Sequence, residues 1–387
     1  MIKLAFKHAA SRWGRSVLLC ASVFVIAALP LVSRGVVSSF EQELRERAET
    51  VPILVGSAGS RFDLVLSALH WRVSKVTPIT LHVAEEIFAE PEAVAIPVHV
   101  RFEARGEPVA AVPLEYFEFR GLTLREGRSI AGLGEAVLGS MAANRLGLSP
   151  GDDLPTDQSR SYDITAPPAI ILRVVGVLAE TGTPDDRAVF VELETAWLLE
   201  GIAHGHQDPT EITDPNQLVG RSDERIALSG AVIEHQRIDA SNAAQFHLHA
   251  DRDDLPITAV MVFPGSDKST AIVRTRVNAD RTLQAISPSE VSEELIGSVL
   301  RVGRLVDAIS VVVGLAMLGL LTLVGMLELR ARADETRVLR DVGASRAQVV
   351  NLFLFEFGGL ATIGFVLALI AARSATGIAN DILVFFT

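Results

Sequence analysis

The sequence predicts a membrane α-helical protein with three spans and a large α+β domain outside the membrane. Three stretches are almost free of charge and long enough to cross a hydrocarbon core: 16–33, 307–327 and 351–373. Between the first two, over residues 34–306, short strand and helix patterns alternate with glycine turns. A chain of 387 residues has room for both parts.

The first span, residues 16–33, carries no charge and lies between Arg15 and Arg34. As a helix it extends about 27 Å, which is enough for a thin bilayer. The basic residues before it also fit a signal peptide. Pro30, together with the absence of a small-residue cleavage site before Arg34, favours an uncleaved anchor instead.

The loop charges predict the orientation of these spans. Residues 1–15 carry four Lys or Arg and no acid, and the loop 328–350 carries five arginines against four acidic residues. Short basic segments stay in the cytoplasm, so residues 34–306 are expected on the outer side. The residues 374–387 form a short tail after the third span, with an apolar end, 382–386, that is too short to cross.

Composition excludes several classes of protein. The formal net charge is −12, with an acidic region over 34–327 between two short basic segments, and this balance argues against nucleic acid as a partner. Cys20, within the first span, is the single cysteine of the sequence, so the outer domain has no disulfide and depends on its apolar core. This pattern favours the inner membrane of a bacterial cell.

The outer domain is predicted as an α/β unit with a β-rich insertion over about 121–225. Before the insertion we expect the first span to continue as a helix over 40–48. We also expect a second helix at 62–71 and strands at 51–55, 93–101 and 109–113. Within the insertion we expect strands at 135–139, 174–178 and 188–191 and a helix at 141–146. After it, a strand at 257–263 and a helix at 270–286 complete the unit.

No motif for catalysis is found in the sequence. The closest approach to a phosphate-binding loop is 265–270, where Asp267 stands in the place that needs glycine before the lysine. The segment instead predicts a strand-to-helix turn with Ser269 or Thr270 as N-cap. We therefore expect a non-enzyme that binds no cofactor and contains no ATPase of its own.

Histidines offer one weak candidate for a metal site. His247, His249 and Asp251 alternate, so on one strand they would share a face, as ligands of a divalent transition metal can. An exposed polar strand face explains the same alternation and is the preferred interpretation. His204 and His206 are expected in a polar loop.

The spans carry small residues and one carboxylate. Gly364, Ala368 and Ala372 recur every four residues in the third span, and Ser310 and Gly314 do so in the second, which predicts close helix contacts. A carboxylate inside a bilayer is costly. Glu356 is therefore expected at the membrane interface where the third span begins, within reach of Arg346 or Arg340.

The loop between the second and third spans carries the most specific motif, E-x-x-x-L-R-x-x-G-A-S. It consists of Glu335, Leu339, Arg340, Gly343, Ala344 and Ser345. The motif resembles the coupling segment of MacB/LolE/FtsX-type ABC transporter permeases. Further cues in the same order as in that family are Glu135-Ala-Val-Leu-Gly139 and Thr181-Gly-Thr-Pro-Asp-Asp-Arg187.

The resemblance implies a porter-like α/β module split by a smaller, sabre-like β module. It also implies that a cytoplasmic ABC ATPase, using ATP and Mg, docks on the coupling segment. Leu339 and Val342 would face the ATPase groove or the membrane, Arg340 would pair with an acidic partner, and Gly343 would end the helix. A second permease copy, identical or not, is a further implied partner, and a periplasmic adaptor or an outer-membrane component could join them.

The function that the resemblance implies is mechanotransmission, in which the outer domain moves to export or extract a lipoprotein, peptide, lipid or small toxic compound. Two alternatives stay open: a non-transporting regulator of an envelope enzyme, as in FtsX, and a membrane-tethered sensor or binding protein without an ATPase. The family's usual fourth span is missing from the pattern. This indicates either a truncated reading frame or a three-span variant.

Overall fold

The computed structural model describes residues 13–89, 93–157, 170–205, 218–221, 226–228, 237–238, 242, 245–248, 250–331 and 333–386. These residues form two compact units, one from 1–43 and 294–386 and the other from 44–293. Most of the basic N-terminus and the histidines 206 and 249 lie outside the described residues.

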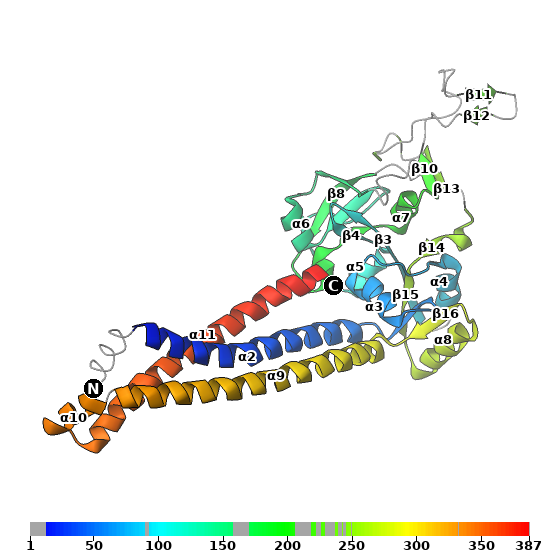
Figure 1. The fold of residues 1–387 in the computed structure, drawn as a ribbon. Helices are drawn as coiled ribbons and strands as arrows, with labels where there is room; N and C mark the ends of the chain where they lie inside the picture. The colour runs from blue at the N-terminus through cyan, green and yellow to red at the C-terminus, as the bar shows by residue number, and fades with distance from the viewer. Residues whose placement is uncertain are drawn as a thin grey trace. The chain divides into compact units, whose positions relative to one another are not determined.

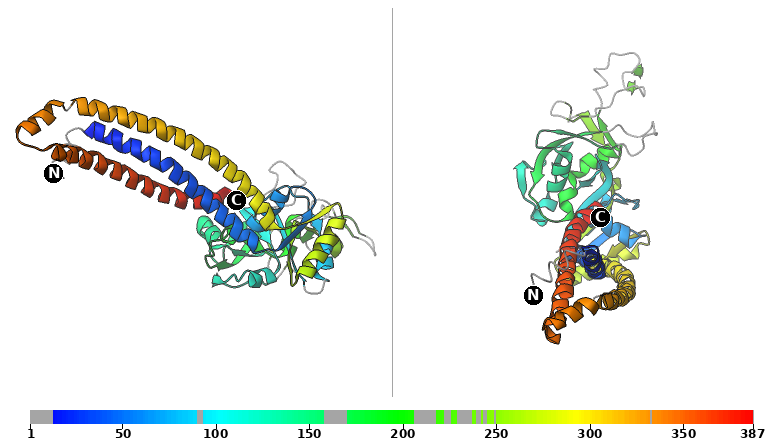
Figure 2. Two further views of the ribbon diagram at one scale, coloured as in Figure 1. Left: turned by 90° about the horizontal axis from the view of Figure 1, so that it is seen from below. Right: turned by 60° about the vertical axis from the view of Figure 1, so that its left-hand side comes forward.

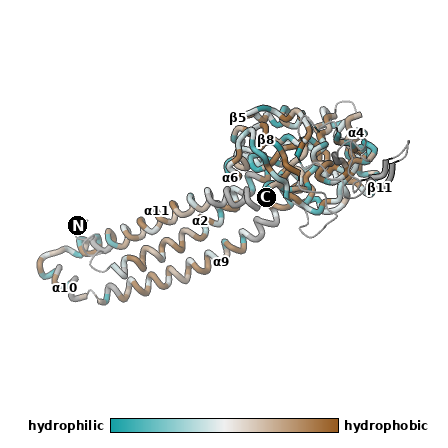
Figure 3. The backbone as a smooth tube through the Cα atoms, turned by 90° about the horizontal axis from the view of Figure 1, so that it is seen from above, coloured by the Kyte–Doolittle hydropathy of each residue, from teal (hydrophilic) through white to brown (hydrophobic). Residues whose placement is uncertain are grey.

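The first unit is helical. Its elements are α2 (Trp13–Glu49), α9 (Pro288–Ala331), α10 (Ala333–Asp341) and α11 (Arg346–Phe386), of which α2 and α9 also extend into the second unit. Within this unit α2, α9 and α11 lie side by side (Figures 1 and 2). Among the described residues, three helices are long and apolar enough to cross a membrane, over Ser16–Glu49, Gly303–Leu327 and Arg346–Ala375. Figure 3 shows the hydrophobic residues that recur along each of them.

The ends of two helices bear on the sequence-based expectations. α2 continues past the first apolar stretch to Glu49, so the expected continuation of the first span over 40–48 is confirmed. α11 continues without a break through the segment 374–386 to Phe386.

The second unit is built on a 10-stranded sheet in the order β16-β1-β15-β3-β4-β9-β6-β8-β5, with β7 paired to β8. The strands at the β16 side are β16 (Leu283–Ile286), β1 (Ile53–Ser57), β15 (Ala259–Pro264), β3 (Ala93–Ala104) and β4 (Glu107–Ala111). Those at the other side are β9 (Val189–Val191), β6 (Glu135–Leu138), β8 (Ile171–Leu178), β5 (Leu124–Gly127) and β7 (Asp153–Pro155).

Three further strand pairs lie outside this sheet, β2 (Ile79–Thr80) with β14 (Pro256–Ile257), β10 (Ala203–Gly205) with β13 (Phe246–Leu248), and β11 (Leu218–Arg221) with β12 (Ile226–Leu228).

The expected β-rich insertion shares this sheet with the α/β part. The link is β3, whose first half pairs with β15 and whose second half pairs with β4. The register of the β3–β4 pair shifts between Val100 and Phe102, as at a β-bulge, where a strand bends. β4 then pairs in parallel with β9, a strand within the expected insertion. The insertion therefore extends the first sheet rather than forming a sheet of its own.

Helices cover the sheet and the loops close to it. They are α3 (Arg61–His70), α4 (Leu81–Phe88), α5 (Glu115–Phe119), α6 (Ser140–Leu146), α7 (Leu193–Leu199) and α8 (Asp267–Ala279), with single 3-10 turns at η1 (Pro184–Arg187) and η3 (Arg252–Asp254).

The expected helix over 270–286 is wrong in its extent. It begins earlier, because Ser266 rather than Ser269 or Thr270 is the N-cap and accepts a hydrogen bond from the Ser269 amide. It also ends at Ala279, because the Asp280 carboxylate accepts the Thr282 amide in a local turn. The chain after that turn pairs with β1 as β16.

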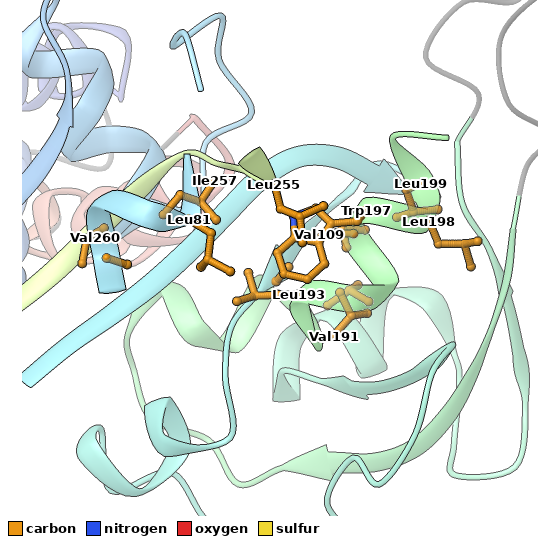
Figure 4. Packing of buried hydrophobic residues seen from close by; sticks show 14 of the residues in the cluster. Leu81, Val109, Val191, Leu193, Trp197, Leu198, Leu199, Leu255, Ile257 and Val260 are labelled. Carbon is orange, nitrogen blue, oxygen red and sulfur yellow. The ribbon is translucent and has the colours of Figure 1, made fainter. Parts of the chain in front are cut away.

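Two apolar clusters form the core, one for each face of the sheet. Figure 4 shows part of the first, where Leu193 and Trp197 of α7 pack beside Leu81 and Val109. The second cluster packs α3 against the sheet and includes the fully buried Trp71. Burial on both faces supplies the stability that the chain needs without disulfides.

Candidate functional site

The segment between the second and third apolar helices folds as the short helix α10, followed by a turn. Gly343 has φ of +100°, a conformation that glycine adopts at the C-terminal end of a helix. The amides of Val342 and Gly343 donate to the carbonyls of Val338 and Arg340. The prediction that Gly343 ends the helix is therefore confirmed.

A capping box begins the next helix. Ser345 Oγ accepts a hydrogen bond from the Gln348 amide at 3.2 Å, and Gln348 Oε1 accepts one from the Ser345 amide at 2.9 Å. This reciprocal pair fixes the point at which α11 starts. Sequence reasoning missed this role of Ser345, although the S-x-x-Q pattern was there to be read.

The side chains of α10 present both charge and apolar surface. Arg337, Arg340 and Val338 are exposed, and Val342 in the turn is 84% exposed. The side chains of Glu335 and Leu339 lie outside those that the structure describes. An exposed valine beside exposed arginines is the kind of surface that a protein partner covers.

Glu356 lies inside α11 rather than at the beginning of the helix. Its side chain is 7% exposed. Ten residues of helix separate it from Arg346, which corresponds to about 15 Å along the axis. Glu356 therefore lies within α11 rather than at its first residue, and its expected place at the membrane interface stays a prediction.

Small residues permit the contact between α2 and α11, as predicted. A Cβ atom on Gly364 would lie 2.6 Å from the Cys20 carbonyl oxygen and 3.1 Å from Val23 Cβ. Ala368 and Ala372 on the same face of α11 are buried. The Cys20 thiol also donates to the Leu360 carbonyl at 3.5 Å. The two backbones therefore approach closely only because glycine stands at 364.

A buried ion pair lies in the outer unit, at the end of α2. Arg47 donates from Nη1 and Nη2 to the two carboxylate oxygens of Asp185 at 2.9 and 2.8 Å. Trp71 Nε1 and the Tyr116 hydroxyl donate to the same carboxylate at 2.9 and 2.8 Å. Arg47 also donates from Nη2 to the Tyr116 hydroxyl oxygen at 3.0 Å and from Nε to the Leu69 carbonyl oxygen at 2.8 Å. We call Arg47, Trp71, Tyr116 and Asp185 the anchor cluster.

The anchor cluster is almost completely removed from solvent, with side-chain exposures of 3% for Arg47 and 0% for Asp185. Burial alone would raise the pKa of Asp185, but Arg47, Arg120 and the Tyr116 hydroxyl outweigh it, so that the pKa lies below its usual value. Burial is also the main cause that raises the pKa of Tyr116. Arg47 and Asp185 are therefore both charged at neutral pH, and each compensates the other.

The loop that carries Asp185 is itself tightly organised. Thr183 caps η1, accepting the Asp185 amide, and the Asp186 carboxylate accepts the amides of Thr181 and Gly182. The loop rests on Gly139, where a Cβ atom would lie 2.3 Å from the Asp185 carbonyl oxygen. The two sequence cues around Gly139 and Asp185 thus meet in space.

His70 lies beside the ion pair and carries no charge near neutral pH. Burial, and then the neighbouring Arg47, lower the pKa of His70 to about 3. Neither ring nitrogen meets a hydrogen-bond partner among the described residues. A second positive charge so close to Arg47 is thereby avoided.

Comparison with known families decides the identity of this fold. Residues 19–228 match the family model of the MacB-like periplasmic core domain, which is more than half of the chain. The chain belongs to this family. The match confirms the resemblance to MacB/FtsX-like ABC transporter permeases, and it includes every residue of the anchor cluster.

Two solved structures are similar to this MacB-like chain. One is the periplasmic region of MacB from Actinobacillus actinomycetemcomitans, at 10% identity and a TM-score of 0.38, covering 66% of this chain and 98% of that one. The other is the extracellular domain of the noncanonic ABC-type transporter YknZ from Gram-positive bacteria, at 10% identity and a TM-score of 0.33, covering 60% and 98%. A comparison with curated proteins finds no match. The family model alone carries the assignment.

Among the described metal-site candidates of this MacB-like chain, His247 lies on β13 and Asp251 does not. β13 ends at Leu248, His249 lies outside the described residues, and Asp251 is the N-cap of η3. The alternation therefore does not continue to Asp251 as expected, because the chain turns after the strand. The structure instead brings His82, Glu85 and Asp253 within 4.8 Å of one another, all of them exposed.

Proposed function

We propose that this chain is the permease subunit of an ABC transporter, a non-catalytic membrane protein that transmits force from a separate cytoplasmic ATPase to its extracytoplasmic domain. The observation that carries the proposal is the course of α2. One unbroken helix includes an apolar stretch long enough to span a membrane and ends in the anchor cluster.

An anchored helix can transmit a displacement that a flexible linker would absorb. Arg47 belongs to the last turn of α2, and its bidentate bond to Asp185 ties that turn to the loop before β9. β9 in turn pairs with β4 and β6 in the middle of the large sheet. A movement of α2 along its axis would therefore be passed directly to the sheet.

The proposed topology has residues 1–15 and 328–350 in the cytoplasm and 34–306 outside, in a bacterial inner membrane. The positive-inside rule supports it. An ion pair also supports it: Arg34 and Asp307 are the charges that border the first and second spans on the outer side, and they bond through two contacts of 3.3 and 3.2 Å. Charged residues at the same ends of neighbouring spans are expected to lie at the same depth relative to the membrane.

The ATPase would dock on α10 and the turn after it, and would supply the ATP and Mg chemistry. A second permease copy would complete the transporter, with an adaptor or outer-membrane component as further partners. β3, which pairs with β15 in its first half and β4 in its second, would be the boundary between a porter-like and a sabre-like part. The substrate would be a lipoprotein, peptide, lipid or small toxic compound that is handled outside the membrane.

Co-purification of the full-length chain with a co-expressed ABC ATPase tests this function. Val342→Asp and Arg340→Glu change exposed side chains of the docking segment, so they should remove the ATPase without disturbing membrane insertion. Arg304→Glu, an equally exposed charge reversal on α9, serves as the control and should retain the ATPase. Equal recovery of the ATPase by the wild type and by all three variants would favour the alternative of a membrane-tethered sensor without an ATPase.

A further inference from the structure

The outer unit contains a groove that no part of the proposed transmission uses. It lies between α4, β3 and the start of α7 and encloses about 620 Å³. Leu81, Leu193 and Trp197, which Figure 4 labels, belong to its lining and are themselves buried. Phe88 and Leu114 also line it, and they are 67% and 42% exposed. A volume of this size is in the range of sites for small organic ligands and short peptides.

The rim of the groove is acidic. Glu85, Glu115, Glu192 and Glu194 all line it, and Arg252 is the one cation among the described lining residues. Arg252 is already engaged, because its Nε lies 3.3 Å from Glu85 Oε1. The carboxylates of Glu115, Glu192 and Glu194 therefore remain at the rim, above the apolar floor that Leu193, Trp197 and Phe88 form.

Glu192 shows that these carboxylates lack a matching positive charge. Partial burial first, then the neighbouring Glu194, Glu135 and Glu115, raise the pKa of Glu192 above its usual value. Although Glu192 is the residue before α7, its side chain makes no capping hydrogen bond. Its carboxylate is therefore not needed to begin that helix.

We propose that this groove binds a cationic amphiphile, with the apolar part of the ligand on Leu193, Trp197 and Phe88 and its amine groups at the glutamate rim. Charge complementarity selects this class over an anionic or neutral one, since an anion would meet three carboxylates and no free cation among the described lining residues. The role of the ligand as a transported substrate rests on the proposed function, but binding to the groove does not.

Binding is measured on the full-length chain in phosphatidylcholine nanodiscs, with empty nanodiscs subtracted. The probe is a short peptide of lysine and leucine that carries a neutral fluorophore, and its counterpart replaces lysine by glutamate. We expect the lysine peptide to raise the fluorescence anisotropy and the glutamate peptide to leave it unchanged. Equal binding of both peptides, or of neither, overturns the proposal.

Substitutions at the rim then locate the site. Each exposed ion pair contributes about 0.2–1 kcal/mol, so Glu192→Gln with Glu194→Gln should weaken binding of the lysine peptide roughly 2- to 30-fold. Glu118→Gln with Glu293→Gln removes the same charge from exposed positions outside the groove and should leave the affinity unchanged. Equal affinities in the two double variants would overturn the site.

The apolar floor has its own test. Phe88→Ser removes an exposed aromatic ring of the groove and should weaken the lysine peptide several-fold without unfolding the domain. Unchanged affinity would overturn the amphiphile proposal. None of these variants touches α10, so co-purification of the ATPase should persist in all of them. A failure of the groove proposal is thereby distinguishable from a failure of the permease function.

Discussion

Replacing Arg47 by methionine tests the anchor cluster. The change keeps most of the apolar volume but leaves the Asp185 carboxylate without the two guanidinium bonds at 2.8 and 2.9 Å. Trp71 and Tyr116 still donate to it, and the longer ion pair with Arg120 at 3.7 Å becomes its remaining contact with a positive charge. Loss of one partner of a buried pair costs roughly 3–5 kcal/mol when the other charge is left unpaired, and because Arg120 compensates part of the Asp185 charge we expect the lower end of this range.

The assay is hydrogen exchange of the full-length protein in nanodiscs, read on the amides of the outer unit. Arg34→Met is the matched control, since it breaks the ion pair with Asp307 in which Arg34 is 71% exposed, and it should cost less than about 1 kcal/mol. Combining Arg47→Met with Asp185→Asn removes both buried charges and should recover part of the loss. If Arg47→Met costs no more than Arg34→Met, the cluster does not anchor α2.

Three further predictions follow from neighbouring contacts. The pKa of His70 is about 3 in the folded chain and about 6.5 in the unfolded chain, so the unfolded chain alone takes up a proton as pH falls from about 6.5. The outer unit should therefore lose up to about 1.4 kcal/mol of stability per pH unit. His70→Gln should flatten this slope in denaturation measured between about pH 6.5 and 4.5. Gly364→Val should separate α2 from α11 and lower the melting temperature of the helical unit, whereas Gly359→Val, with open space at its Cβ, should cost less. Gly139→Ala should push the Asp185 loop away and lower outer-unit stability by about 1–3 kcal/mol in the hydrogen-exchange assay, and a loss below 0.5 kcal/mol would mean that the loop does not rest there.

Local patterns predicted much of the fold. The apolar stretches, the helix that ends at Leu146, and the end of α10 at Gly343 follow from hydropathy, periodicity and the freedom of glycine. The small residues at 364, 368 and 372 predicted a helix contact for the same reason. In each of these places the physical cause lies within a few residues of the effect.

The anchor cluster could not be predicted in this way. Arg47 and Asp185 are 138 residues apart, and Arg47 belongs to a charged run in which Arg45 and Glu46 are exposed. Nothing in the run distinguishes the one arginine that turns inward. The same limit applies to β16, whose strand character depends on pairing with β1 rather than on its own four residues.

Cross-linking at position 342 tests the central claim most directly. Cys20 is the single cysteine of the sequence, so a Cys20→Ser chain with Val342→Cys carries one thiol, at a residue that is 84% exposed. With a co-expressed ABC ATPase in native membranes, a short thiol-to-amine cross-linker should join the two proteins at position 342 and not in the matched Arg304→Cys chain. Cross-linking from position 304, or from neither position, would contradict the assignment of 333–346 as the segment on which the ATPase acts.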